Sequence, residues 1–570
     1  MIRGWARAAW RRIGSLSVVL VLAYCVIHAF DPPRLNWGDS YSDYNVMTAG
    51  RNFQRYGFMN MRLTPVLLDA RLVTPTDRRL LYTHYPQLPD LMNGVLRKVF
   101  RLSDLIQFRF VALGFSFAAL WFVYRLICAY WTRDVAQVAL ALWLLNPLWI
   151  QHADYLHHGP YAAFFGFGGL YFLVQFLQDH RRRGMLAASG AFTFLLFFAS
   201  YDYWFFIPLL YAVATIGQYR ALTRRSLAVL AFLSLFALAA VACKFATNAW
   251  VLGGLGPLVR DLRFQWIERS ASQAVDMTYG SGVWITLVGR VERCFSLLLF
   301  PVAAFWLVAP FLRRRMPATL RGVLNPGILF LAAVPFLWIF INLWVLQYYP
   351  TLLVLPFYAV GCAVVIVQLL RSRERMLRMA GVTLFVALLA NSIDEDLRFK
   401  KAFFPVEVIR TMKAQLDALS APGQYIIVNH MWDSAYAYYF DRNTVLLALN
   451  EPNRIDEALA YYTNPKRIRV APSTGAIFVQ HKHVADELFD KGFYHVLARN
   501  GMWKEWANPE RYHASIDAFV KERDSVLVSK VSQVGLKVYD SEFYALWVIP
   551  VNGTITPGSR AEIPGPSPRY

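Results

Sequence analysis

The sequence is poor in charged residues and in cysteine. Only 17% of its 570 residues are Asp, Glu, Lys or Arg, against about 25% in ordinary soluble domains, whereas 57% are hydrophobic. These proportions exclude a soluble cytosolic enzyme and a disordered protein. The five cysteines all lie in or beside apolar runs, and none follows Cys362. No disulfide framework or zinc ribbon can therefore be read from the sequence.

Acidic residues are scarce in the first part of the chain, and this explains the net charge of +21. Residues 396–570 are nearly balanced, with 21 basic and 19 acidic residues, whereas residues 1–395 hold 37 basic and 18 acidic ones. Arginine clusters alternate with long apolar runs, and the short loops 151–160, 200–203 and 347–350 contain no Lys or Arg. This alternation is the positive-inside pattern of a multi-spanning membrane protein, and it argues against a nucleic-acid partner.

The apolar runs predict about eleven membrane-spanning helices, because a span needs about 20 mostly apolar residues. The first run resembles a signal sequence, but no small-residue cleavage site follows it, so we expect an uncleaved anchor with a cytoplasmic N-terminus. An odd number of spans then places the C-terminus outside. The predicted spans are 14–30, 106–127, 134–151, 159–177, 185–200, 203–218, 226–247, 292–311, 325–346, 351–370 and 378–394.

Three segments are too polar or too long to be spans, and together with the spans they predict the domain organisation. Residues 1–395 form a helical polytopic membrane domain, with outer loops at 31–106 and 248–291. Residues 396–552 alternate helical and strand patterns, which predicts a soluble α/β domain outside the membrane. The Pro/Gly-rich tail, 553–570, is predicted to be disordered. Within the α/β domain we expect helices at 405–419, 455–462 and 484–491, strands at 425–429, 444–449 and 476–480, and β-rich sequence over 525–550.

The first outer loop carries two acids at the point where the first span meets water. Asp39 and Asp43 are four residues apart, so they share one face if the segment is helical. Either carboxylate could act as a general base that takes a proton from an acceptor hydroxyl. The alternative is structural: Asp39 caps a helix at the membrane surface, and Asp43 pairs with Arg51.

Three stretches together resemble a known family. They are 36–57, which holds the acids and the Gly50-Arg51-Asn52 segment, then Thr83-His84-Tyr85-Pro86-Gln87-Leu88, and then Ser103-Asp104 followed by Arg109. This pattern resembles the GT-C glycosyltransferases, in the branch of protein O-mannosyltransferases and lipid A aminoarabinose transferases. The specific motifs cover about residues 36–160, and the resemblance in topology continues to about 395.

The resemblance implies a membrane enzyme that transfers a sugar from a polyprenyl-phosphate donor to a hydroxyl of a glycan, glycolipid or protein, outside the cytoplasm. It implies that Asp43 is the base, with Asp39 as the competing candidate, and that His84 and Tyr85 contact substrate. The lack of nucleotide-binding motifs such as Gly-x-Gly-x-x-Gly or Walker A fits a sugar that arrives on a lipid. Arginine-rich loops favour a bacterial inner membrane.

Other outer loops supply polar residues for the same substrate site. Asp154, His157 and His158 stand within five residues of one another, and Asp and His are metal ligands, so Asp154 and His157 are candidates for a divalent metal cation. The alternative is a hydrogen-bonded cluster near the lipid headgroups. A lipid phosphate also needs a cationic partner. The remaining candidates for substrate binding are Asp202, Lys244, Arg260, Gln347 and Tyr348.

A transporter or lipid flippase is the alternative function. Against it stand the absence of detectable inverted repeats, the absence of acids at mid-depth in the spans, and the large outer segments. In the C-terminal domain, His430 and Asp433 follow a predicted strand, and we interpret them as structural.

Overall fold

The computed structural model describes residues 40–66, 83, 85–269, 281–311, 324–340, 349–399, 406–420, 422, 425–429, 436–446, 476–482 and 509–549, with four single residues between 19 and 26. The chain divides into two compact units, which are described separately. Unit 1 holds residues 1–31, 84–89 and 102–401, and unit 2 holds residues 32–83, 90–101 and 402–570.

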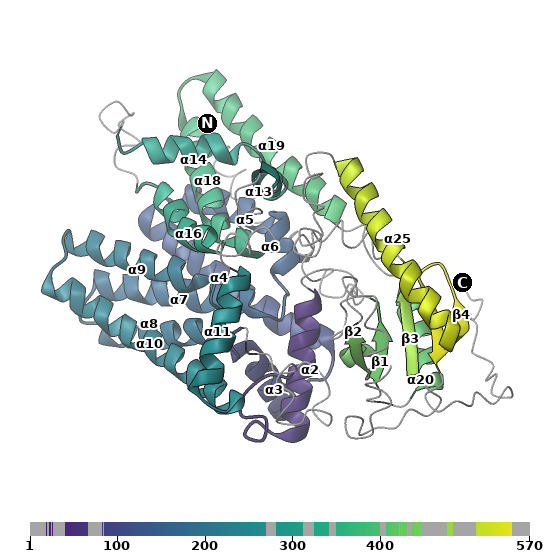
Figure 1. The fold of residues 1–570 in the computed structure, drawn as a ribbon. Coiled ribbons are helices and arrows are strands. Elements are labelled where there is room, and N and C mark those ends of the chain that lie inside the picture. Colours follow the sequence, from purple (N-terminus) through teal and green to yellow (C-terminus); the bar gives the residue numbers. More distant parts are fainter. Residues whose placement is uncertain are drawn as a thin grey trace. The chain divides into compact units, whose positions relative to one another are not determined.

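Unit 1 is helical (Figure 1). Its described elements are α4 (Leu105–Tyr130), α5 (Arg133–Leu144), α6 (Pro147–His152), α7 (His158–Gln178), α8 (Arg183–Ala199), α9 (Tyr203–Tyr219), α10 (Arg224–Leu252), α11 (Leu255–Arg269), α13 (Ser281–Phe295), α14 (Leu299–Val308), α16 (Gly327–Ile339), the 3₁₀ helix η4 (Tyr349–Val354), α18 (Leu355–Arg371) and α19 (Arg375–Phe399).

Among the residues that the structure describes, five helices are long and apolar enough to cross a membrane: α4, α7, α10, the stretch Pro350–Arg371, and α19 through Glu395. The apolar segments Leu287–Phe295 and Leu299–Val308 make a sixth span if they are taken together, although they are bent by 96°. Two shorter apolar helices, α8 and α16, come in addition. The chain is therefore a polytopic helical protein by composition. The predicted number of about eleven spans is not confirmed by the described residues.

Local sequence explains where the helices begin and break. Asp104 caps α4 by accepting a hydrogen bond from the Ile106 backbone N–H at 3.1 Å, and Gln107 completes a capping box. The segment 134–151, predicted as one span, is instead two helices. Asn146 caps α6 and Pro147 is its first residue, and proline lacks the N–H that would continue α5.

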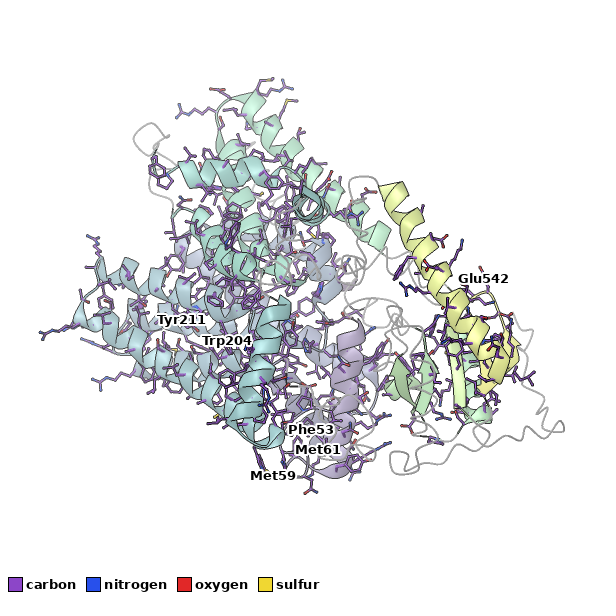
Figure 2. The ribbon with its side chains drawn as sticks, viewed as in Figure 1. Phe53, Met59, Met61, Trp204, Tyr211 and Glu542 are labelled. Atoms are coloured by element: carbon purple, nitrogen blue, oxygen red, sulfur yellow. The ribbon has the colours of Figure 1, made fainter. Side chains whose placement is uncertain are left out.

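Small residues let the helices of unit 1 approach closely. A Cβ at Gly169 on α7 would lie 2.3 Å from the Tyr211 hydroxyl of α9, so only glycine fits there. Ser189 on α8 donates to the Gly169 carbonyl at 2.9 Å, and the Thr193 and Tyr211 hydroxyls are 3.0 Å apart (Figure 2 labels Tyr211). Small residues with a few hydrogen bonds between helices are typical of packing within membranes.

Unit 2 combines the first outer loop with the C-terminal part of the chain. Its helices are α2 (Ser40–Tyr56), most of α3 (Leu88–Phe100), α20 (Val406–Leu419) and α25 (Pro509–Val534), with a short π-helix, η5 (Tyr436–Phe440). Its strands are β1 (Tyr425–Val428), β2 (Asn443–Leu446), β3 (Ala476–His481), β4 (Leu536–Asp540) and β5 (Tyr544–Ile549).

The strands form one mixed sheet in the order β2-β1-β3-β5-β4 (Figure 1). β1 is parallel to β2 and β3, and β5 is antiparallel to β3 and β4. The predicted helix 405–419 and the predicted strands at 425, 444 and 476 are confirmed as α20, β1, β2 and β3. The prediction of β-rich sequence over 525–550 is wrong in its first part, because α25 continues to Val534. The predicted helices 455–462 and 484–491 lie outside the described residues.

Close packing of small residues also joins α2 to α3. A Cβ at Gly50 would lie 1.9 Å from Asn93 Oδ1, and one at Gly94 would lie 2.8 Å from the Phe53 side chain. Phe53, labelled in Figure 2, is fully buried and stacks on Phe58 with ring centroids 5.1 Å apart. The two helices of the first outer loop thus form a tightly packed pair within unit 2.

Candidate active site

A buried polar cluster in unit 1 brings together residues that lie far apart in the sequence. His158 is the first residue of α7, Asp202 immediately precedes α9, and Lys244 lies on α10. Tyr85 comes from the short segment before α3. Each of these four residues is at most 7% exposed, although all four carry titratable groups. Burying such groups is costly, so proteins retain them mainly where function uses them.

His158 and Asp202 form the shortest ion-pair contact in this cluster. His158 Nε2 lies 2.6 Å from Asp202 Oδ2, and Ser200 Oγ donates to the same carboxylate oxygen at 3.3 Å. The ring nitrogen Nδ1 of His158 contacts Nδ1 of His157. The carboxylate therefore fixes the orientation of the His158 imidazole.

Tyr85 connects the histidines to Lys244. Its ring stacks on His158 with centroids 5.1 Å apart and meets His157 edge-on at 4.9 Å. Lys244 Nζ donates to the Tyr85 carbonyl at 2.5 Å and lies 4.9 Å from the centroid of the Tyr201 ring. The ammonium thus lies between a backbone dipole and an aromatic face, both of which stabilise a cation.

Neighbouring polar side chains hold this segment to α10. Gln87 Nε2 donates to Asn248 Oδ1 at 2.9 Å and to Thr247 Oγ1 at 3.2 Å. Gln87 and Asn248 are both fully buried. Neither residue was predicted as a site residue from the sequence, although Gln87 belongs to the motif at residues 83–88 that carries the family resemblance. Asn248 gave no local signal, because only folding brings it next to a residue 161 positions away.

Asp154 lies in the same loop region but has a different partner. Its carboxylate is 3.9 Å from Arg109 Nε of α4, and both side chains are buried. Asp154 and His157 were predicted as metal ligands, but a metal site needs further ligands. The described residues contain no group of three or more His, Cys, Asp or Glu that could hold a metal ion. The residues of this loop that the structure describes therefore do not fit a metal centre.

The predicted general base belongs to unit 2. Asp43 lies in the first turn of α2 and is 4% exposed. On the same helix, Arg51 donates to the Ala437 carbonyl and lies 3.5 Å from Asp441 of the C-terminal part.

The other predicted site residues are not part of the cluster as described. Arg260 is exposed on α11, in contrast to Lys244, which is fully buried. The remaining candidates, Asp39, His84, Gln347 and Tyr348, lie outside the described residues, as do His430 and Asp433.

The fold of the chain is similar to that of two solved proteins, an archaeal oligosaccharyltransferase and ArnT. An oligosaccharyltransferase from Archaeoglobus fulgidus in the apo form matches with a TM-score of 0.54 over 84% of this chain and 71% of its own, at 13% identity. ArnT from Cupriavidus metallidurans bound to undecaprenyl phosphate matches with a TM-score of 0.53 over the whole of both chains, at 12% identity. The oligosaccharyltransferase and ArnT thus share their architecture with this chain but little of its sequence.

A further structure of the Archaeoglobus enzyme, named AglB and in complex with an inhibitory peptide and a dolichol-phosphate, matches with a TM-score of 0.50 at 13% identity. No family model matches the sequence. No curated protein matches it either. The resemblance predicted from the motifs is thus confirmed at the level of the fold.

Proposed function

We propose that this protein is an integral-membrane glycosyltransferase that moves a sugar from a polyprenyl-phosphate donor to an acceptor hydroxyl. The shared GT-C fold supports this proposal, as do two neighbours that bind lipid phosphates, ArnT with undecaprenyl phosphate and AglB with dolichol-phosphate. We further propose a bacterial inner-membrane location, with the N-terminus in the cytoplasm and the chemistry outside it, in keeping with the arginine-rich loops.

The buried Lys244 cluster is the observation that carries the proposal. A lysine with no exposed surface on an apolar helix is expensive to retain, and its ammonium, beside Tyr85 and Tyr201, suits a phosphate that loses its sugar. In a site of low dielectric constant, such a cation stabilises the negative charge that develops on the leaving phosphate.

Asp43 is the base in this proposal. The acceptor hydroxyl transfers its proton to the Asp43 carboxylate, and the acceptor oxygen bonds to the anomeric carbon of the sugar. The bond between that carbon and the phosphate oxygen breaks, and the electron pair leaves on polyprenyl phosphate. Attack on the side opposite the leaving group inverts the anomeric centre. No step requires a metal ion.

The test is donor turnover by the purified full-length protein in lipid nanodiscs. We would incubate it with a panel of polyprenyl-phosphate sugars and a mixed acceptor extract, with and without EDTA, and measure the release of free polyprenyl phosphate. We expect release with one donor class, and a loss of about 10²-fold or more in Asp43→Asn, because general-base catalysis contributes about that much.

The matched control is Asp179→Asn, which changes a carboxylate that is exposed in a short loop and pairs with Arg182. We expect this variant to keep full turnover. The proposal is refuted if no donor is consumed, or if the protein moves a labelled lipid between leaflets without changing it, as a flippase would. Full turnover in Asp43→Asn would refute only the assignment of Asp43 as the base, and the proposed glycosyltransferase activity would stand.

A further inference from the structure

The helix α11 begins directly after the apolar helix α10 ends. α10 has the highest mean hydropathy of the five candidate spans, and Leu235 and Leu238 on it are 64% and 65% exposed. It ends at Gly253, whose φ of 82° lies in the left-handed region that favours glycine. The Gly254 N–H donates to the Ala249 carbonyl at 2.8 Å, and α11 starts at the next residue. With α10 across the bilayer, the first turn of α11 therefore lies where this span reaches the membrane surface.

α11 itself is not a span. It has 15 residues, whereas a helix needs about 20 to cross the hydrocarbon core. Figure 1 shows α11 running across the direction of α7, which is another candidate span of the same unit. A helix that leaves the end of a span and takes this course stays in the plane of the membrane surface.

The outward face of α11 is apolar in its first turns. Leu255 is 72% exposed and Val259 is 62% exposed, and they share one face because they are four residues apart. Leu258, between them, is 4% exposed and faces the interior of the unit. In the last turn of α10, Trp250 is 45% exposed, and tryptophan at the end of a span is typical of the interface between lipid and water. Apolar side chains are thus open to the surroundings at this level.

Two arginines accompany this apolar face. Arg260 follows Val259 directly, and Arg263 lies one turn further along the same face as Val259; both are exposed. Neither arginine forms an ion pair with any residue that the structure describes. Asp261 is half-buried, so the exposed charge of this face is positive. A helix at the membrane surface with open apolar side chains and unpaired cations is attracted to anionic lipids.

We propose that the exposed face of α11, formed by Leu255, Val259, Arg260 and Arg263, docks on the bilayer surface and binds an anionic phospholipid in preference to a zwitterionic one. The aliphatic side chains enter the boundary between headgroups and acyl chains, and the guanidinium groups donate charge-assisted hydrogen bonds to the lipid phosphate. The occupant is a bulk lipid of the leaflet at which α10 ends, because this face is open to the bilayer, in contrast to the buried Lys244. The inference does not depend on the proposed function.

The test is photocrosslinking by the full-length protein in lipid nanodiscs, with Val259 replaced by the photoreactive p-benzoylphenylalanine. The nanodiscs consist of phosphatidylcholine and carry, at equal mole fraction, alkyne-tagged phosphatidylglycerol or alkyne-tagged phosphatidylcholine. After irradiation, the yield of lipid adduct is measured. We expect at least about fivefold more adduct from phosphatidylglycerol, since one arginine near an anionic surface contributes about this factor. The combined variant Arg260→Gln and Arg263→Gln should reduce the preference to about one, and it should fold because both residues are exposed.

Two controls match these changes. Arg410→Gln, which alters an exposed arginine on α20, should keep the preference for phosphatidylglycerol. The same photoreactive residue at Leu536, which is 53% exposed on β4 and outside the candidate spans, should give no lipid adduct.

The proposal is overturned by equal adducts from the two tagged lipids, by a preference that survives in the arginine variant, or by equal lipid adducts at Val259 and Leu536. A protein–protein adduct at Val259 would assign this face to a second copy of the chain and is equally contrary. Loss of the lipid adduct on addition of polyprenyl phosphate would assign the face to the donor, and the proposal would then be wrong. A protein that gives the expected adducts but consumes no donor would refute only the proposed function.

Discussion

Lys244→Met separates a functional role of the buried lysine from a structural one, because stability and activity should respond differently. The variant removes the hydrogen bond from Nζ to the Tyr85 carbonyl, which costs about 1.5–3 kcal/mol. It also removes the cost of keeping an ammonium fully buried, which is several kcal/mol per ion. Methionine has a similar shape, so the two effects should nearly cancel.

We therefore expect the Tm of Lys244→Met to stay close to that of the wild type, or to rise. Sugar transfer should fall by about 10²–10³-fold, the loss seen when one preorganised charge-stabilising donor is removed. The loss should appear in kcat and kcat/KM alike, because the proposed role of the lysine is to stabilise the charge that develops during transfer.

The assay is the release of polyprenyl phosphate under initial-rate conditions, with differential scanning fluorimetry on the same sample. Lys413→Met is the matched control: Lys413 is exposed on α20 and pairs with Asp417, so neither quantity should change. The reasoning is refuted if Lys244→Met transfers sugar at the wild-type rate. It is equally refuted if activity and Tm fall together, because the lysine would then act through the fold.

Three further changes give distinct outcomes. Gly50→Ala should destabilise unit 2 by about 1–3 kcal/mol through the clash with Asn93, whereas Gly114→Ala, with open space around it, should be neutral or stabilising; thermal melting of both would decide. Asp202→Ala should cost about 1–3 kcal/mol by leaving a buried imidazole without its carboxylate, and a Tm equal to that of the wild type would contradict the described pair. Hydrogen bonds from two lysines hold the pKa of Asp540 below 3.8, so its contribution to stability is present at neutral pH and is lost as the pH falls through the lowered pKa. Asp540→Asn should therefore be slightly less stable than the wild type at pH 7, by less than about 1 kcal/mol, and this difference should shrink as the pH falls through the lowered pKa; a difference that does not change with pH would count against this.

Much of the fold was predictable because its signals are local. The apolar run after Asp104 predicts α4 almost to the residue, since the cap and the hydropathy agree. Strand patterns around 425 and 476 predict β1 and β3 for the same reason. The break at Asn146-Pro147 was missed, because overall hydropathy outweighed a turn signal that was present in the sequence. The last part of α25 was predicted as strand because it contains the β-branched and apolar residues Val526, Leu527 and Val531. In the structure these residues are helical, and Leu527 and Val531 lie four positions apart on one buried face of the helix.

The candidate site was predictable only residue by residue. Acidic residues and histidines are rare beside apolar runs, and for this reason His158 and Asp202 were predicted as site residues from the sequence. That they pair at 2.6 Å could not be predicted, because 44 positions separate them and no sequence pattern records the contact. The pair of Arg51 on α2 with Asp441 could not be predicted for the same reason, because 390 positions separate the two residues.

The joining of the first outer loop to the distant C-terminal part sets the order in which the protein can be completed during synthesis. Arg51 reaches its carbonyl partner across 386 residues. At about 5–20 residues per second, a ribosome needs roughly 20–80 s to make the intervening chain. This loop is therefore made long before its partner on η5. A chain truncated before η5 would lack this contact, so unit 2 can be completed only after the helices of unit 1 up to residue 401 have been made.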